Sequence, residues 1–277
     1  MRLMTKISII GLGWIGLPLA KVLQKKGHTV IGSTTTAEKQ SRLIAEGIDA
    51  IHFSLVPFPQ GIGFQKLFAS EVLVLNIPPR SRSTDGKNYL EQLKFLRSMV
   101  DQSSIQKIIF VSSTGVYPDQ NREEIYTEEE EVTAHNTGNI PLLKGESAFS
   151  NFNKVTIVRF GGLLGDDRVP GKYVASRENV NGSSRVNYIY RNDAARMLAW
   201  IIENELWNET FNGVAPIHPL RKDVYERNVI DLGIEPPKSY SKASQGNDRL
   251  VSGEKILNTG FTFLNPDPLE FPYFLRG

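Results

Sequence analysis

Cysteine is absent from the chain. Its absence excludes disulfide bonds, thiolate metal sites and a cysteine nucleophile, and it fits a cytoplasmic protein. Histidine is also scarce, and the four histidines lack the spacing of metal ligands, so we expect no metal site. They are His28, His52, His135 and His218.

Long apolar runs and an excess of one charge are missing as well. No apolar stretch reaches the roughly 18 residues that a membrane span needs. Charged residues make up 22% of the chain, the net charge is only +2, and no long basic run suggests a nucleic-acid groove. We therefore expect a small-molecule substrate, and neither a membrane nor a nucleic acid as partner.

A glycine motif stands near the N-terminus. Gly11, Gly13 and Gly16 have the spacing G-x-G-x-x-G. The segments around them read as a strand at 6–10, a helix at 17–26 and a second strand at 28–33. This order of strand, glycine turn, helix and strand is typical of a dinucleotide-binding unit.

Each glycine of the motif has a predicted role in holding a pyrophosphate. Gly11 can adopt the tight turn, Gly13 lets the backbone approach the ligand, and Gly16 allows the helix to pack closely on the strand. The phosphate charge would face free N–H groups at the positive end of the helix dipole. We therefore predict a cofactor site here, which also includes Trp14 and Ile15.

The same stretch has two other interpretations. Arg2 and Lys6 precede an apolar run that closes on Leu-Pro-Leu-Ala, which is similar to a secretory signal. The three glycines interrupt that run, whereas a signal needs an uninterrupted apolar region, so we favour the nucleotide site. A glycine-rich turn without a ligand is the second alternative.

Strand-like and helix-like segments alternate along the rest of the chain. Further strands are expected at 51–55, 71–76, 107–113 and 155–160. These runs are apolar nearly throughout, as in parallel strands that helices cover on both faces. A helix should begin near Lys87, with an apolar face formed by Leu90, Leu93, Leu96 and Val100.

The alternation predicts an α/β protein with a doubly wound parallel sheet, the NAD(P)-binding Rossmann fold. A small C-terminal substrate lobe is implied by the resemblance to a known family that motifs further along the chain carry. We expect residues 1–165 to form the Rossmann core. Residues 166–277 should form a mixed region with the substrate lobe, within which 187–215 return to the core. The segment that starts at His218 should contain a helix that ends near Gly233.

The end of the second strand favours NADP over NAD. A carboxylate that grips the adenine ribose usually stands there and would repel a 2′-phosphate, but no Asp or Glu precedes Glu38. Hydroxyl side chains occupy the place instead, at Ser33, Thr34, Thr35 and Thr36. With Lys39 and Arg42 they could hold the phosphate by charge-assisted hydrogen bonds. The alternative is that both cations form the exposed face of a helix.

The segment 112–117, Ser-Ser-Thr-Gly-Val-Tyr, resembles a motif of the extended short-chain dehydrogenase/reductases, which include nucleotide-sugar epimerases, dehydratases and reductases. Asn76 and Pro78 lie in an Asn-Ile-Pro-Pro segment similar to that of an atypical branch, the NAD-dependent epimerase/dehydratase-like proteins. Other segments that resemble the family lie at 159–165, 187–195 and 211–214. The resemblance covers nearly the whole chain and implies contacts from Asn76 and Pro78 to the cofactor.

The same resemblance implies catalysis by a serine, a tyrosine and a lysine. Ser113 would hydrogen-bond a substrate oxygen, and Lys144 would hold the nicotinamide ribose and lower the pKa of the tyrosine, which exchanges the proton. The family's tyrosine lies four residues before the lysine, in Tyr-x-x-x-Lys. Ile140 occupies that place in this chain, and an alkyl side chain cannot exchange a proton.

The missing tyrosine leaves several alternatives open. Tyr117 or Tyr126 could substitute for it, and Tyr117 is our candidate, although its counterpart in the family belongs to a packing motif. Glu128 is another possible acid. The chain could also have kept the cofactor and lost the reaction, which would make it a sensor or scaffold that binds NADP(H).

The first glycine motif is also similar to the start of UDP-sugar 6-dehydrogenases, but this chain has no catalytic cysteine and is too short for their further domains. Cations after Gly165 would suit an anionic substrate such as a nucleotide sugar, or are surface charges. They are Arg168, Lys172, Arg177 and Arg185. Extended members of the family often dimerise, so we expect a monomer or a homodimer.

Overall fold

The computed structural model describes residues 4–79, 86–120, 124–241 and 249–275. Arg2, on which the interpretation as a secretory signal partly rests, lies outside the described residues. Within the described part of the chain, no helix is both long enough and apolar enough to cross a bilayer.

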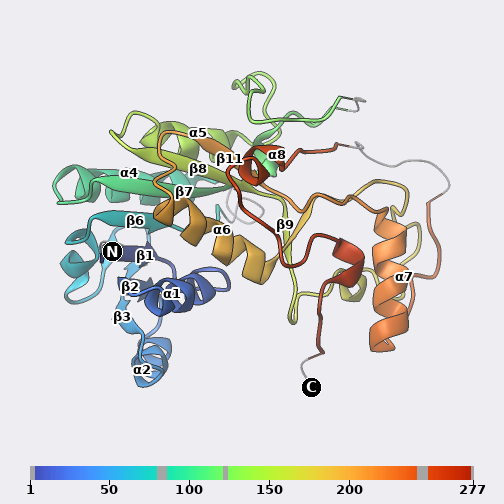
Figure 1. The fold of residues 1–277 in the computed structure, drawn as a ribbon, viewed down its shortest axis with the longest axis horizontal. Coiled ribbons are helices and arrows are strands. Elements are labelled where there is room, and N and C mark those ends of the chain that lie inside the picture. The colour runs from blue at the N-terminus through green and yellow to red at the C-terminus, as the bar shows by residue number, and fades with distance from the viewer. Residues whose placement is uncertain (1–3, 80–85, 121–123, 242–248, 276–277) are drawn as a thin grey trace. The chain divides into compact units, whose positions relative to one another are not determined.

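A seven-stranded sheet has the order β11-β8-β7-β6-β1-β2-β3, which confirms the predicted doubly wound fold (Figure 1). The strand bounds are β1 Lys6–Ile10, β2 Thr29–Thr34, β3 Asp49–His52, β6 Val72–Leu75, β7 Lys107–Ser113, β8 Val155–Phe160 and β11 Thr210–Gly213. Strand β1 pairs in parallel with β2 and β6, β2 with β3, and β6 with β7. Strands β2 and β3 lie on one side of β1, and β6, β7, β8 and β11 lie on the other, so the strand order switches at β1. The glycine motif directly follows β1.

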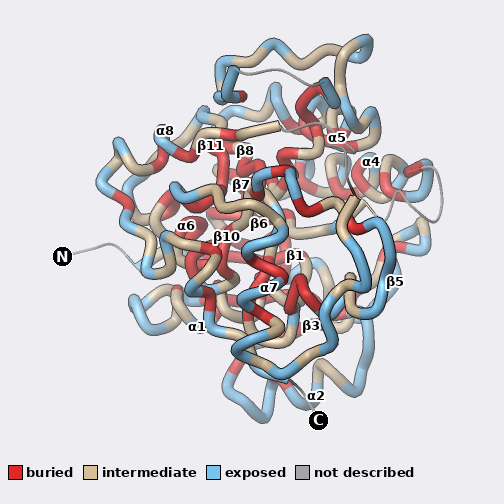
Figure 2. The backbone as a smooth tube through the Cα atoms, turned by 90° about the vertical axis from the view of Figure 1, so that its right-hand side faces the viewer, coloured by how far each residue is buried: buried red, intermediate tan, exposed pale blue. Residues whose placement is uncertain are grey.

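The central strands are apolar because they are covered on both faces. All four residues of β6 are buried, and in β1 only Lys6 is exposed. Figure 2 shows buried stretches, in red, along the strands at the centre of the sheet. The predicted strands at 6–10, 107–113 and 155–160 agree with β1, β7 and β8.

The predicted strand at 51–55 divides into two. Strand β3 follows β2 only to the pair Thr34 and His52, where β2 ends. The next two residues with strand geometry, β4 Ser54–Leu55, pair in antiparallel fashion with β5 Pro59–Gln60. The length of β3 is therefore set by the length of β2. The sequence of residues 51–55 alone contains no information on where β2 ends.

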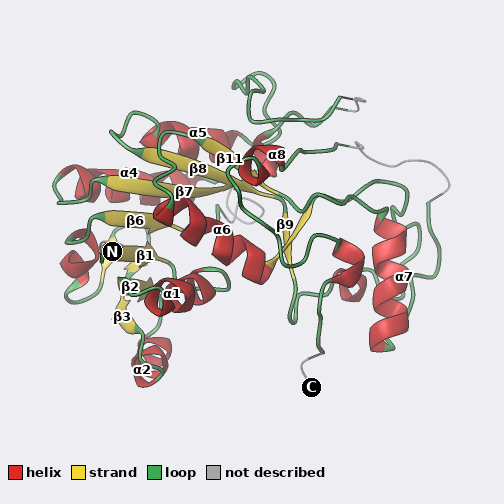
Figure 3. Cartoon of the chain, viewed as in Figure 1, coloured by secondary structure: helices red, strands yellow, loops and turns green. Residues whose placement is uncertain are grey.

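The helices agree with the predicted alternation. They are α1 Gly16–Lys25, α2 Ala37–Ala45, α4 Lys87–Asp101, α5 Ile140–Phe149, α6 Arg191–Glu203, α7 Arg221–Leu232 and the short α8 Glu254–Leu257. Helix α4 buries Leu93, Leu96 and Val100 as expected. It packs against α5, and α5 against β7 (Figure 3). Helix α7 ends at Gly233, whose φ of +61° allows the left-handed turn that closes the helix.

The described residues form two compact units. The first consists of Met1–Val116, Asn139–Arg159 and Ala195–Thr210, and the second of Tyr117–Gly138, Phe160–Ala194 and Phe211–Gly277. The first unit contains the glycine motif, and the second contains α7 and a small parallel sheet of β9 Gly162–Leu164 and β10 Tyr188–Tyr190. The functional division at residue 165 stays a prediction.

Candidate functional site

The turn between β1 and α1 can be built only with glycine at two of its three glycine positions. Gly11 has a φ of +105°, and a Cβ on it would lie 2.6 Å from the carbonyl oxygen of Asn76. A Cβ on Gly16 would collide with the carbonyl oxygen of Gly11. The first residue makes the tight turn and the last brings the helix close to the strand, as the motif predicts.

Gly13 differs from its two neighbours in the motif. A Cβ on Gly13 would meet no atom within 4 Å, so the chain itself gives no reason for a glycine. The backbone beside Gly13 is open on the side where the predicted pyrophosphate would approach. This open space is the property that a diphosphate requires of the turn, and the residues present therefore fit the group.

The start of α1 supports the same site. Its N-cap residue, Ile15, offers no side-chain acceptor, and the first turn contains no acidic residue. The first N–H groups of a helix need an acceptor, and an anion placed there also benefits from the helix dipole. Ile15 is buried and Trp14 is half-buried, and the contact of either with a cofactor stays a prediction.

Two residues predicted to bind the cofactor hold the turn in place. Ser33 Oγ accepts a hydrogen bond from the Gly11 N–H at 2.9 Å, and the Ser33 carbonyl accepts one from the Leu12 N–H at 2.7 Å. Asn76 Nδ2 donates to the Gly11 carbonyl at 3.1 Å. These bonds fix Gly11 from both neighbouring strands, whether or not Ser33 and Asn76 also contact the ligand.

Helix α2, which follows the end of β2, carries two cations, Lys39 and Arg42, without a counter-ion among the described residues. Thr34 is buried, Thr35 is exposed, and the Thr36 side chain accepts a hydrogen bond from the Lys39 N–H at 3.3 Å as the cap of α2. Burial and the nearby charge of Arg42 lower the pKa of Lys39. Neither cation makes an ion pair with any residue that the structure describes. An anion at this position would therefore not have to displace a carboxylate.

No hydrogen bond joins Lys144 to Ser113 in the part of the chain that the structure describes, and their shared role in catalysis stays a prediction. Helix α5 buries Leu142 and Glu146, whereas Lys144 and Ile140 are exposed, the latter by 47%. A Cβ on Gly115 would lie 3.5 Å from Ser113 Oγ and 3.6 Å from Leu142 Cδ1, so Ser113 and Leu142 of α5 both lie close to Gly115. No hydrogen bond or ion pair joins Lys144 to another residue in the described ranges.

Tyr117, the candidate for the missing tyrosine, lies in the core of the second unit. It is fully buried, its hydroxyl donates to Asn212 Oδ1 at 2.8 Å, and its ring packs against Tyr126 with centroids 5.3 Å apart. Glu128 accepts a hydrogen bond from the Asn212 N–H at 2.7 Å. All three candidates for the proton donor thus belong to one packed cluster, and their role in catalysis stays a prediction.

Comparisons with known proteins agree with this geometry. Residues 6–61 match the family model of the NAD-binding domain of 6-phosphogluconate dehydrogenase. The Escherichia coli K12 protein YeeZ is 31% identical over 275 residues, which cover 97% of this chain and 99% of YeeZ. The chain belongs to the YeeZ family. Its structural neighbours include proteins described as an NAD-dependent epimerase/dehydratase and as a short-chain dehydrogenase/reductase, which matches the resemblance found in the sequence.

Solved structures place the family by fold. A Methylobacillus flagellatus protein described as an NAD-dependent epimerase/dehydratase superposes with a TM-score of 0.74 at 25% identity, covering 96% of this chain and 95% of that one. MoeE5, solved with UDP-glucose and NAD, superposes with a TM-score of 0.73 at 14% identity, covering 93% of each chain. This YeeZ-family chain therefore carries a Rossmann domain that binds a nicotinamide dinucleotide.

Sequence reasoning missed a buried ionic network beneath α5. Glu146 Oε1 accepts hydrogen bonds from Ser112 Oγ at 2.6 Å and from Arg159 Nε at 3.1 Å, and Oε2 accepts one from a terminal nitrogen of Arg159 at 2.8 Å. All three residues are buried. The network ties α5 to β7 and β8 and fixes which face of α5 points inward. A glutamate on a short helix gives no signal of burial in a single sequence.

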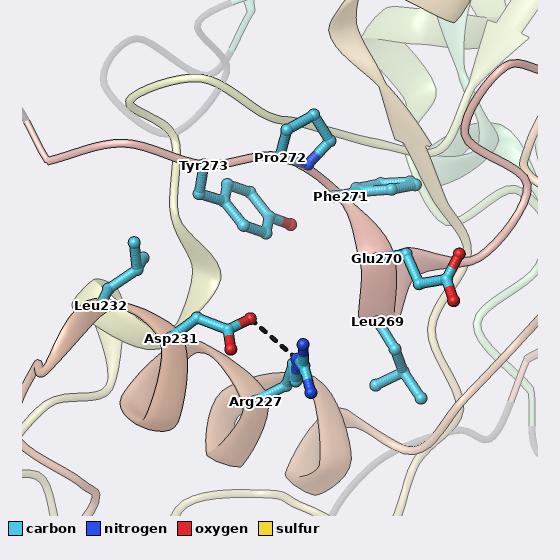
Figure 4. A pocket seen from close by; sticks show the side chains of 8 residues that line it. All are labelled: Arg227, Asp231, Leu232, Leu269, Glu270, Phe271, Pro272 and Tyr273. Carbon is cyan, nitrogen blue, oxygen red and sulfur yellow. Dashed lines mark hydrogen bonds and ion pairs between the residues drawn. The ribbon is translucent and has the colours of Figure 1, made fainter.

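A cavity of about 350 Å³ lies within the second unit, between α7 and the segment 269–273 (Figure 4). Its polar wall on α7 is Arg227, whose Nε donates to Asp231 at 2.8 Å. The lining contains none of the residues predicted for cofactor or catalysis. The cavity therefore gives no support to the predicted site.

We predict that Gly13→Val abolishes binding of a nicotinamide dinucleotide and leaves the fold intact. The added side chain has room in the protein but would occupy the space of the pyrophosphate. Calorimetric titration measures the binding and circular dichroism the fold. Gly16→Val is the matched control, since its side chain meets backbone and should disturb folding itself. If folded Gly13→Val bound the dinucleotide as tightly as the native protein, the predicted pyrophosphate site at this turn would be wrong.

We predict that Glu146→Ala lowers the free energy of unfolding by about 3–5 kcal/mol, because it removes the carboxylate to which two nitrogen atoms of the buried Arg159 side chain donate. Glu91→Ala is the control, since Glu91 forms an exposed pair with Lys94 and its loss should cost less than about 1 kcal/mol. Urea denaturation monitored by circular dichroism measures both values. Equal effects of the two changes would show that the buried network adds no stability.

Proposed function

We propose that the protein is an NADP-dependent oxidoreductase, or an epimerase or dehydratase that uses the nucleotide transiently. Its substrate would be a sugar-like alcohol or carbonyl, such as that of a nucleotide sugar. The observation that carries the proposal is the turn in which Gly11 and Gly16 are sterically required while Gly13 faces open space. A turn that only connected a strand to a helix would not need a glycine at position 13.

The preference for NADP rests on the end of β2. The second strand ends without a carboxylate, and the first acidic residue after it, Glu38, is exposed on α2. Lys39 and Arg42 are close enough for the charge of one to lower the pKa of the other, and neither has a counter-ion among the described residues. A 2′-phosphate would relieve this repulsion and accept charge-assisted hydrogen bonds.

The nicotinamide ring of the bound cofactor supplies hydride transfer. Of the predicted catalytic residues, Ser113 ends β7 and is half-buried, and its Oγ accepts the Gly115 N–H at 3.1 Å, which leaves its own hydrogen free to donate to a substrate oxygen. Lys144 would hold the ribose, and Tyr117 would exchange the proton. MoeE5, a protein of this fold, was solved with UDP-glucose, which supports a nucleotide sugar as substrate.

A second candidate function is a sensor or scaffold that binds NADP(H) without turnover. The place of the family's tyrosine is taken by the exposed Ile140, and the exposed Lys144 has no partner among the described residues. The hydroxyl of Tyr117 is buried and donates to Asn212. Such a site would still bind the nucleotide but would lack a group that exchanges a proton with a substrate. The protein would then sense the redox state of the nucleotide and transmit it to a partner.

We predict that the protein binds NADPH more tightly than NADH and that Thr35→Asp reverses the preference. A carboxylate at this exposed position would repel the 2′-phosphate and bind the ribose hydroxyls instead. The expected change in the ratio of the two dissociation constants is about tenfold or more, or about 1.4 kcal/mol. Thr35→Asn is the uncharged control. An unchanged ratio would show that Thr35 does not face the ribose.

The enzyme and the sensor are separated by a turnover assay with NADPH or NADP and a panel of sugar nucleotides, ketones and aldehydes. We expect a change at the nicotinamide absorbance band or, for an epimerase that regenerates its cofactor, a new sugar signal in proton NMR. Ser113→Ala should abolish the turnover and keep the affinity for NADPH. Tight binding of NADPH without any turnover across the panel would favour the sensor.

A further inference from the structure

Arg221, the first residue of α7, is held in the second unit with part of its charge unmatched. Its Nε atom is shielded from solvent and donates to no acceptor in the described part of the chain. No carboxylate of the described residues pairs with its guanidinium. The second arginine of α7, Arg227, lies near the middle of the helix and forms an ion pair with Asp231 on the same helix.

Two tyrosines lie beside this guanidinium. Tyr188, on β10, and Tyr225, one turn after Arg221 on α7, share a hydrogen bond between their side chains. Burial raises the pKa of the Tyr188 hydroxyl, followed by the influence of Tyr225, while the positive charge of Arg221 acts in the opposite direction. Tyr225 is only 6% exposed. The charge of Arg221 therefore acts on the hydroxyl group of Tyr188, which is hydrogen-bonded to Tyr225.

The neighbouring backbone is already satisfied. The N–H of Arg221 donates to the Ser184 carbonyl at 2.9 Å, and the N–H of Lys222 donates to the Gly182 carbonyl at 3.0 Å. The start of α7 thus offers little to a ligand through its main chain. A ligand would instead bind to side chains, namely the guanidinium group of Arg221 and the hydroxyl groups of Tyr188 and Tyr225.

This part of the lobe also borders an exposed stretch of backbone. A Cβ on Gly162, at the start of β9, would lie 2.6 Å from Cδ1 of Tyr188, so the tyrosine ring rests directly on that glycine. Gly162 is exposed. The ring of Tyr188 therefore borders backbone that is exposed to solvent.

An arginine Nε that is withdrawn from water without an acceptor, as in Arg221, is costly to the free protein. Groups of this kind are retained where a ligand completes them. A planar oxyanion, either phosphate or carboxylate, would match the guanidinium and accept hydrogen bonds from hydroxyl groups at the same time. Among the basic residues of this lobe, the geometry separates Arg221 from those that only face solvent, such as Lys172 and Arg177.

We propose that Arg221, together with the hydroxyl groups of Tyr188 and Tyr225, binds an oxyanionic group of the substrate. The inference rests on the proposed function in taking the second unit to hold the substrate. It assigns the recognition of the anion to one residue of α7 and makes the substrate a phosphorylated or carboxylated compound.

The first test is calorimetric titration of the full chain with saturating NADPH, so that no probe enters the cofactor site. The probes are UDP, inorganic pyrophosphate and glucuronate. We expect at least one of them to bind, and Arg221→Gln to weaken that binding by about tenfold or more (about 1.4 kcal/mol). Arg227→Gln, the same change on the same helix, should leave it unchanged. Binding of UDP and pyrophosphate indicates a phosphate, and binding of glucuronate alone a carboxylate.

The second test separates a ligand-binding arginine from a structural one. Arg221→Met removes the unmatched charge and keeps much of the apolar stem, so the midpoint of thermal unfolding of the ligand-free protein should stay the same or rise. The increase of the midpoint that a binding probe causes in the native protein should disappear. A structural arginine would give the opposite result, with a lower midpoint in Arg221→Met and an unchanged response to the probe.

The two proposals fail in different ways. If the native protein does not bind NADPH, the proposed function is wrong. If NADPH binds but none of the three probes does, or if a probe binds Arg221→Gln as tightly as the native chain, the assignment of Arg221 is wrong while the cofactor site stands.

Discussion

The nucleotide site depends on how closely the backbone of one turn approaches its surroundings. Gly11 touches the end of β6 and Gly16 touches Gly11, so the turn is compressed on two sides. Hydrogen bonds from β2 and from Asn76 hold it in that state. At Gly13 the turn is open, because a Cβ built there would meet no atom within 4 Å, and α1 begins three residues later. Packing within the protein thereby leaves space beside Gly13, where we propose that the pyrophosphate binds.

Each of the two units contains positive charge that no carboxylate of the described residues neutralises. In the first unit, Lys39 and Arg42 extend the positive potential of the helix start along the end of β2. In the second, Arg221 keeps a buried guanidinium atom without an acceptor. In both places no carboxylate of the described residues pairs with the positive charge, whereas Arg227 is paired on its own helix. The anionic ligands that we propose at these two places would neutralise that charge.

Much of the fold could be predicted from the sequence because it follows from local rules. Strands β1, β7 and β8 are uninterrupted apolar runs, and the roles of Gly11 and Gly16 follow from the backbone alone. Strand β3 could not be bounded, because its length is set by β2. The face that Lys144 presents and the pairing of Glu146 with Arg159 depend on contacts between elements far apart in the chain, and a single sequence contains no record of them.

The network around Glu146 also has an evolutionary consequence. Its three hydrogen bonds clamp α5 onto β7 and β8 from the inward side of the helix. Residues on the outward side, including Ile140 and Lys144, carry no part of that attachment. Substitutions there leave that attachment in place. A helix fastened in this way can exchange its outward side chains, and with them the groups that it offers to a ligand, without losing its packing on β7 and β8.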